Sequence, residues 1–459
     1  MKLYIKRILF LVAIGLSILA CDSFTEIDLP ETQLTGQAVF KDDVTATAAL
    51  MDIYARIREG GMLSGNIDGL SHLLGIYTDE LDFYGTATSP AEAFYNHTVI
   101  PTNAFVSALW DRTYSQIYAT NVLLKGLENN TDISKESLNI LQGEALFIRG
   151  LLHVYLVELF GDVPYISTPD YVNNASTSRT PVSEVYENVV ADLLNAKNLL
   201  SESYTRFERV RPNKFAVSAL LSRIYLYTKN YELAALEASY VIDSDIYQLE
   251  SNLDYVFLKN ASSSLWQLHS GISGVNTIEA RTFIFESGPP IVSAVSQNLL
   301  DAFELTDMRK NQWLRAITDG TTTWYHPYKY KQNGSTGVSE EYAIILRLEE
   351  CYLIRSEART HLDNFLGAQQ DLNKIRNRAG LSNTLANTKT LLLEAILQER
   401  RVEFFTEHGH RFIDLKRNNS LGTVLSPLKP SWKTTHLLLP LPEKELLLNN
   451  SLQPQNMGY

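Results

Sequence analysis

Two stretches of the chain carry the same helical pattern with the same internal offsets. In "LLSRIYLYTKNYELAALEASYVI", a second helix is predicted to open at Tyr231, with Ala234 and Ala238 giving it a face of small residues. In "LIRSEARTHLDNFLGAQQDLNKI" the same offsets return, at Phe365, Ala368 and Leu372. Small residues at this spacing let two helices approach closely. Both stretches therefore predict tightly packed helical hairpins.

This pattern is that of the tetratricopeptide hairpin, but the copies stand too far apart for a tandem array. A pair of unrelated helical hairpins is the alternative. Two further stretches, "VTATAALMDIYARI" and "NAFVSALWDRTYSQIYATNVLLKGL", place apolar residues at helical spacing. Between these two, the segment 75–101 breaks the period and is rich in Gly, Thr, Pro and aromatic residues. We expect a long loop there.

The start of the chain has the pattern of an export signal. Lys2, Lys6 and Arg7 precede the apolar run from Ile8 to Ala20, which is shorter than the about 20 residues that a membrane helix needs. Cys21 follows at once, in a context that resembles a bacterial lipobox. Residues 1–20 are therefore predicted to be a lipoprotein signal peptide, with Cys21 as the acylated (for example palmitoylated) first residue of the mature chain. An ordinary secretory signal with a cysteine placed by chance is the alternative.

Composition narrows the classes of partner and fold. The formal net charge is -12 and the pI is near 5.3. Proteins that bind nucleic acid or anionic lipid headgroups carry basic patches, so this acidic composition argues against both as partners. Neutral and cationic ligands remain possible. A hydrophobic content of 45% is that of an ordinary globular chain. Cys351 is the only cysteine besides Cys21. We expect it to be a small core residue, with no disulfide in the chain.

Signals for catalysis or for a bound cofactor are weak. Glu399, Glu403 and Glu407 are expected to share one helix face, but neighbouring arginines would hold them ionised, which is wrong for a general acid. His408 and His410 stand two residues apart, unlike the i, i+4 pair of a zinc helix. Phosphate loops and dinucleotide fingerprints are also missing. The sequence predicts no catalytic site, no metal and no cofactor.

Many charged residues within the helical patterns are spaced for ion pairs within and between helices. We expect these residues to be structural: Glu144, Arg149, Glu158, Arg355, Glu357, Arg400, Arg401, Glu403, Arg411 and Asp414.

Five segments, spread over the mature chain, resemble the successive hallmarks of SusD/RagB nutrient-binding lipoproteins. They are "GEALFIRGLLHVYLVELFGDVPYI" (143–166), "RPNKFAVSALLSRIYLYTKNYELAALEASYVI" (211–242), "ILRLEECYLIRSEARTHLDNFLGAQQDLNKIRNRAGL" (345–381), "ILQERRVEFFTEHGHRFIDLKRN" (396–418) and "LPLPEKELLLNNSLQPQNMGY" (439–459). In addition, Asp22, directly after Cys21, resembles the surface-export signal of Bacteroidota lipoproteins.

The resemblance implies a fold, a location and a partner. The fold is mainly α, with four tetratricopeptide-like helical hairpins, irregular loop-rich segments and a few short β hairpins. Residues 21–459 would form a single SusD-like domain, with hairpins at 211–242 and 345–381 and a ligand face in 75–101 and 270–340. The lipid-anchored protein would stand on the outer membrane and act as the lid of a SusC-like TonB-dependent barrel in nutrient uptake, commonly of glycans.

Ligand contacts are expected from aromatic residues in the irregular segments, because sugars present flat C–H faces with polar edges. The candidates are Phe83, Tyr84, Phe94 and Tyr95 in the first segment, Arg281, Phe283 and Phe285 in the second, and Trp324 and Tyr325 in the third. "TDELDFY" resembles the segment that leads into an aromatic binding loop in this family. Here the aromatic residues are Phe and Tyr, with no tryptophan. The alternative for each of these rings is that it packs in the interior beneath its loop and is not displayed to a ligand. Trp266 lies among apolar residues and is expected in the core.

Three hypotheses of function follow. The first is a surface lid that binds a glycan or a peptide without changing it. The second is an enzyme that cuts glycans at the surface. The third is a lid with no ligand site of its own.

Overall fold

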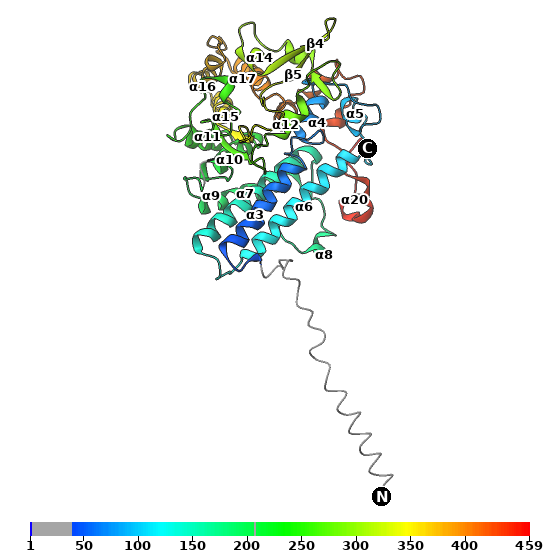
Figure 1. Ribbon diagram of the computed structural model, residues 1–459, viewed down its shortest axis with the longest axis vertical. Coiled ribbons are helices and arrows are strands. Elements are labelled where there is room, and N and C mark those ends of the chain that lie inside the picture. Colours follow the sequence, from blue (N-terminus) through cyan, green and yellow to red (C-terminus); the bar gives the residue numbers. More distant parts are fainter. Residues whose placement is uncertain (2–38, 206–207) are drawn as a thin grey trace.

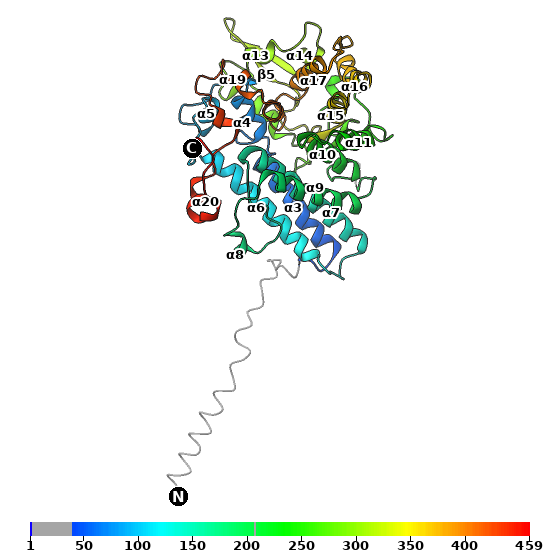
Figure 2. The ribbon, with the colours of Figure 1, turned by 180° about the vertical axis from the view of Figure 1, so that it is seen from behind.

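The computed structural model describes Met1 and residues 39–205 and 208–459. The predicted signal segment after Met1, and Cys21, lie outside the described residues. The helices α3 (Asp43–Glu59), α6 (Ala104–Leu127) and α7 (Lys135–Phe160) pack together at one end of the molecule, and the other end holds short strands, connecting loops and further helices (Figure 1). The described chain begins at the helical end, where Phe40 lies against Gly126 in the last turn of α6. Figure 2 shows the same division from behind.

The described part of the chain is mainly helical, as predicted. The long helices are α3 (Asp43–Glu59), α6 (Ala104–Leu127), α7 (Lys135–Phe160), α9 (Val182–Leu199), α10 (Lys214–Tyr227), α11 (Tyr231–Ile242), α15 (Leu348–His361), α16 (Phe365–Arg378) and α17 (Lys389–Glu403). The shorter ones are α4 (Leu70–Tyr77), α5 (Pro90–Tyr95), α8 (Tyr171–Asn174), α12 (Ile278–Phe283), α13 (Gln297–Leu300), α14 (Met308–Gln312), α18 (His410–Arg417), α19 (Leu421–Leu425) and α20 (Glu443–Leu448).

The strands form short antiparallel pairs. They are β1 (Leu81–Phe83) with β3 (Ser293–Val295), β2 (Ser264–Leu268) with β6 (Ala343–Arg347), and β4 (Leu314–Thr318) with β5 (Thr323–Pro327). Of these pairs, β4 and β5 form a local hairpin, whereas the other two join segments far apart in the sequence.

The two predicted hairpins share one local design. Before α11, Lys229 has a φ of 61°, and the Asn230 side chain accepts a hydrogen bond from the Leu233 N–H. Before α16, Asp363 has a φ of 59°, and the Asn364 side chain caps the helix in the same way. A left-handed residue followed by an asparagine N-cap turns the chain sharply and starts the next helix. This turn accounts for the offsets that recur in the sequence.

The hairpins also pack against each other, as predicted. Helix α11 packs on α15, and α10 also contacts α15. Between them, the Arg223 guanidinium donates to both oxygens of Glu350 at 2.7 and 2.6 Å, with both side chains buried. Segments more than a hundred residues apart in the sequence therefore form one continuous core.

Leu226→Ala should lower the free energy of unfolding by about 2–5 kcal/mol. Leu226 is 2% exposed at the end of α10, so truncation removes buried apolar contacts and leaves a cavity. Urea titration followed by circular dichroism measures the loss. Leu236→Ala is the matched control, because Leu236 is 62% exposed on the adjoining α11 and should change stability by no more than about 0.5 kcal/mol. Equal losses in both variants would contradict the assignment of Leu226 to the core.

Helix α7 is the central helix of the fold. Among the described residues it is the one helix long and apolar enough to cross a membrane, and 83% of its most apolar window is buried inside the protein. Its buried charged residues are paired: Glu144 with Arg211 at 2.8 Å, Arg149 with Asp192 at 2.6 Å, and Glu158 with Lys416 at 3.1 Å. These properties identify α7 as a core helix.

The other charged residues predicted to be structural are paired as well. The pairs are Arg355–Asp371, Glu357–Arg417, Arg400–Asp414, Arg401–Asp79 and Arg411–Asp79. Glu403 has three arginine partners, treated in the Discussion. Cys351 and Trp266 are buried at 1% and 0% exposure, which confirms their assignment to the core.

The prediction of a long loop at 75–101 is wrong in part. The segment contains the end of α4, strand β1 and helix α5. Helix α5 starts because the Ser89 hydroxyl accepts a hydrogen bond from the Ala91 N–H and Pro90 occupies the first turn. Strand β1 exists because β3 pairs with it from about 210 positions later in the chain, a contact that no local pattern reveals.

Candidate ligand-binding site

The three aromatic segments predicted to bind ligand lie next to one another. The first joins the second through the β1–β3 pair, which the Tyr84 N–H extends by donating to the Val292 carbonyl at 2.9 Å. The second meets the third where Gly288 lies against the Trp324 indole. A Cβ at Gly288 would stand 2.2 Å from that ring, so the contact depends on glycine. We call this surface, formed by 81–95, 281–293 and 314–327, the loop face.

The predicted aromatic residues differ in their exposure. Tyr84 is 40% exposed, and Phe83, Tyr95 and Trp324 are half-buried. Phe285 and Tyr325 are also half-buried. These rings provide apolar patches that a sugar ring can cover.

Two of the predicted rings are buried and are removed from the candidate surface. Phe94 is 0% exposed, because it lies on the inner side of α5 with its ring 6.2 Å from that of Tyr77. Phe283 is 5% exposed at the end of α12, with its ring 6.3 Å from that of His72. Both rings support the loop face from below. Arg281, on the same short helix, is exposed.

Tyr95 is held in place by two charged residues that the sequence analysis missed. Its hydroxyl donates to Asp82 Oδ1 at 3.2 Å, and Lys429 Nζ lies 3.5 Å from the centre of its ring. Burial lowers the pKa of Lys429 to about 8, and burial together with Asp82 raises the pKa of Tyr95 to about 12. Asp82 offers a carboxylate beside the exposed ring of Tyr84. Lys429 comes from the far end of the chain, so no local signal pointed to it.

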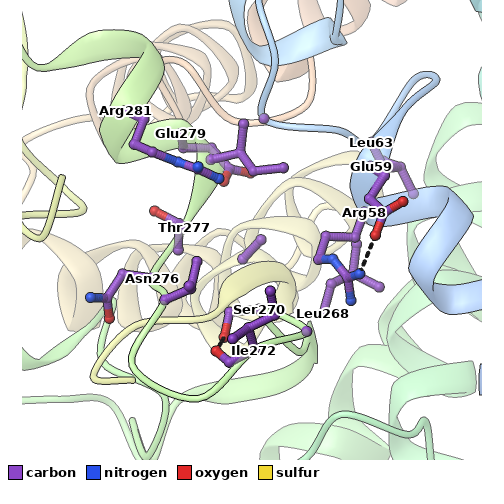
Figure 3. A pocket seen from close by; sticks show the side chains of 15 residues that line it. Arg58, Glu59, Leu63, Leu268, Ser270, Ile272, Asn276, Thr277, Glu279 and Arg281 are labelled. Carbon is purple, nitrogen blue, oxygen red and sulfur yellow. Dashed lines mark hydrogen bonds and ion pairs between the residues drawn. The ribbon is translucent and has the colours of Figure 1, made fainter. Parts of the chain in front are cut away.

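A pocket of about 300 Å³ lies on the other side of α12 (Figure 3). Its walls come from the end of α3 with the following loop, and from the segment between β2 and α12. Glu279 and Arg281 of α12 lie across it from Arg58 and Glu59. Helix α12 therefore contributes to the pocket through Glu279 and Arg281 and supports the loop face through Phe283.

The acids considered for catalysis are buried in the scaffold. Helix α17 ends at Glu403, so Glu407 lies beyond it and the three glutamates do not share one helix face, which corrects the prediction. Arginine neighbours lower the pKa of Glu403, and Arg347 and Lys329 lower that of Glu407, against the effect of burial. For Glu399 burial outweighs Arg309 and raises the pKa, contrary to expectation. All three are at most 8% exposed.

The two histidines of "EHGHR" are also buried. His408 Nε2 lies 3.0 Å from the Ile344 carbonyl oxygen, and the His410 ring packs on Phe404 with 4.8 Å between ring centres. Burial lowers the pKa of both, so both are neutral near pH 7. They pack in the interior of the scaffold.

Comparisons with known proteins agree with this fold. A sequence model of SusD-like proteins, described as starch-binding and associating with the outer membrane, matches residues 77–226, and one of the SusD family matches 303–427. SusD-like protein P2 of Formosa agariphila is 27% identical over 518 aligned positions that span the whole of both chains.

Solved structures show the same architecture. A SusD superfamily protein of Bacteroides vulgatus superposes with a TM-score of 0.81 at 22% identity, over 92% of this chain and all of that one. Surface glycan-binding protein A of Bacteroides thetaiotaomicron, solved with laminarihexaose, superposes with a TM-score of 0.76 at 20% identity, over 90% of this chain and 99% of that one. With two family models matched in chain order and a relative aligned from end to end, this chain belongs to the SusD/RagB family.

Proposed function

We propose that this protein binds glycans at its loop face on the cell surface and acts as the lid of a SusC-like TonB-dependent barrel. The observation that carries the binding role is the meeting of three separate aromatic segments on one face. Family membership, and the related surface glycan-binding protein solved with laminarihexaose, support a glycan over a peptide.

The proposed binding is stacking of a sugar ring on Tyr84 and Trp324, with hydroxyl groups bonded to Asp82 and Arg281. Aromatic rings pack against the C–H faces of sugars, and a few polar groups fix the orientation. The protein would release the glycan unchanged, because the carboxylates of the 399–407 segment are buried in ion pairs and have no access to a substrate.

The lid role follows from family membership and from the proposed anchor. Cys21 would tie the chain to the outer membrane as a lipoprotein, consistent with the family description of association with that membrane. A protein held there at one end can close over a barrel and release its ligand into it. Copurification of a TonB-dependent barrel with the tagged, membrane-extracted protein would support this role, and repeated extraction in mild detergent without such a barrel would contradict it.

Tyr84→Ala should weaken glycan binding several-fold or more. The expected loss is about 0.5–1.5 kcal/mol beyond the effect of buried area, because one stacked ring is removed. Isothermal calorimetry with laminarihexaose and other oligosaccharides measures the affinity, and chromatography of the recovered ligand tests for cleavage.

The control for this variant is Tyr118→Ala, which removes a ring of similar exposure, 44%, on α6, outside the loop face. It should leave the affinity unchanged. Unchanged affinity in both Tyr84→Ala and Trp324→Ala would move the binding site away from the loop face. Steady appearance of shorter oligosaccharides would favour the enzyme hypothesis.

A further inference from the structure

The pocket beside α12 contains a buried acid without a counter-ion. Most polar side chains that line the pocket are already engaged within the protein. Arg58 donates to the His269 carbonyl at 3.1 Å and pairs with Glu59 at 2.6 Å. The Asn276 amide donates to the Gly334 carbonyl at 3.0 Å, and the Thr277 hydroxyl accepts from the Ala280 N–H at 3.2 Å. These groups offer little free hydrogen-bonding capacity to a ligand.

Glu279 is different. It is 4% exposed, and among the described residues its carboxyl makes no hydrogen bond or ion pair with another side chain, only a contact with its own backbone N–H. The carboxyl group lies so close to Gly65 that a Cβ there would stand 2.4 Å from its carbon atom. The absence of a side chain at Gly65 therefore makes room for this carboxyl at the pocket wall.

The surroundings leave the charge of Glu279 largely uncompensated. A second buried carboxyl, Glu341, adds a repulsive charge, while its own oxygens accept the N–H groups of Lys331 and Gln332 at 2.7 and 3.1 Å. Arg281 attracts Glu279 but lies beyond ion-pair distance and is itself exposed to solvent. Burial dominates and raises the pKa of Glu279 to about 7.

A buried carboxyl without a counter-ion is costly when charged and gains strongly from a cation that enters its site. A hydroxyl group of a neutral sugar offers a weaker hydrogen bond, because bonds that involve a charged partner are about twice as strong. The net charge of -12 on the whole chain also favours the approach of a cation over that of an anion.

Resting on the glycan-binding function proposed above, we infer that this pocket recognises a protonated amine on the ligand, as an amino sugar carries, with Glu279 as its counter-ion. Helix α12 positions this recognition at the edge of the loop face, so one oligosaccharide can stack on the aromatic rings and place a charged unit in the pocket. The ligand class is thereby narrowed from glycans in general to glycans that contain free amino groups.

The test is calorimetry of the full mature protein with three oligosaccharides at pH 6, 7 and 8, because the ion pair needs both a protonated amine and an ionised Glu279, whose pKa is about 7. The oligosaccharides are a hexamer of glucosamine, the matched hexamer of N-acetylglucosamine, which has no charge, and laminarihexaose. The glucosamine hexamer should bind about tenfold or more tightly than the acetylated one, because it replaces a neutral hydrogen bond with a charge-assisted one. Glu279→Gln, which keeps the shape of the side chain, should abolish this preference.

Glu59→Gln is the matched control, because it removes a carboxylate from the rim of the same pocket that Arg58 already pairs. Its side chain is 67% exposed, so the preference should change less than about twofold. Circular dichroism and melting curves show whether both variants remain folded. If Glu279→Gln does not fold, Glu279→Asp gives a second test, because it keeps the charge but withdraws the carboxyl by one methylene group, so the preference for the amine should weaken.

The outcomes separate this inference from the proposed function. Binding of the neutral oligosaccharides with no advantage for the amine would overturn the inference and leave the glycan-binding function intact. Binding of an oligogalacturonide that depends on Arg281 and not on Glu279 would overturn it in favour of an acidic ligand. Binding of a lysine peptide that depends on Glu279, with no oligosaccharide bound, would retain the amine pocket and overturn the glycan function.

Discussion

Glu403→Gln is expected to lower the free energy of unfolding by about 3–5 kcal/mol, because it removes one partner from a buried ion cluster. Glu403 is 0% exposed, and its carboxylate has three guanidinium neighbours, Arg309 at 2.8 Å, Arg347 at 2.5 Å and Arg378 at 2.6 Å. The amide keeps the shape of the side chain but not its charge. Each arginine keeps another acidic partner: Asp307 for Arg309, Glu407 for Arg347 and Glu349 for Arg378. The one carboxylate that joins all three is lost, and the buried N–H groups directed at it keep only a neutral acceptor.

Chemical denaturation of the mature protein and the variant measures this loss. Glu128→Gln is the control, since its pair with Lys125 lies at the surface with both side chains more than half exposed. We expect that control to cost less than about 1 kcal/mol. A loss of similar size in the two variants would mean that the buried cluster contributes no more than a surface pair.

The effect should also depend on pH in a defined direction. The arginines hold the pKa of folded Glu403 well below its usual value of 4.5. A lowered folded pKa stabilises the protein above the unfolded pKa, and this contribution disappears as pH falls through the folded value. The difference between the native protein and Glu403→Gln should therefore be full at pH 7 and shrink at pH values below about 4.5.

This cluster links the helical scaffold to the loop face. Arg347 ends β6 and precedes α15, Arg378 ends α16, and Glu403 ends α17. Lys329, two residues after β5, donates to the backbone carbonyls of Glu403 and Phe405 at 2.7 and 2.9 Å. Because β5 carries Trp324, a shift of Lys329 and the backbone it binds would also move a ring of the proposed binding surface. Weaker glycan binding in Glu403→Gln would thus be an indirect effect of the scaffold.

The helical half of the fold could be predicted from the sequence because its determinants are local. Helical periodicity gave α3 and α6 within one or two residues of their observed bounds. The two hairpins were predicted from small residues at recurring offsets. The structure shows that these offsets come from turns at Asn230 and Asn364, where a left-handed residue and a helix cap act within a few positions. The charged residues predicted to be structural in these helices form ion pairs with residues of opposite charge, as their spacing indicated.

The candidate site could be predicted only in outline. Aromatic residues in irregular segments gave a set of candidates, but no local pattern distinguishes the buried ring of Phe94 from the exposed ring of Tyr84 ten residues earlier. That difference arises from how α5 packs on Tyr77. Lys429 reaches the ring of Tyr95 across more than three hundred positions of sequence. The room for the Glu279 carboxyl depends on Gly65, which lies about 210 positions earlier in the chain.

Cys21→Ala should abolish attachment to the outer membrane, because acyl chains on Cys21 are the proposed anchor. Two or more acyl chains hold a protein stably on a bilayer, and the Cys21→Ala chain would lack them. Fractionation of cells and labelling with a radioactive fatty acid measure attachment and acylation. Cys351→Ala is the matched control: it removes the other cysteine, a thiol 1% exposed in the core, and should leave the label unchanged. Label and membrane association that persist in Cys21→Ala would show that the cysteine stands by chance behind an ordinary secretory signal.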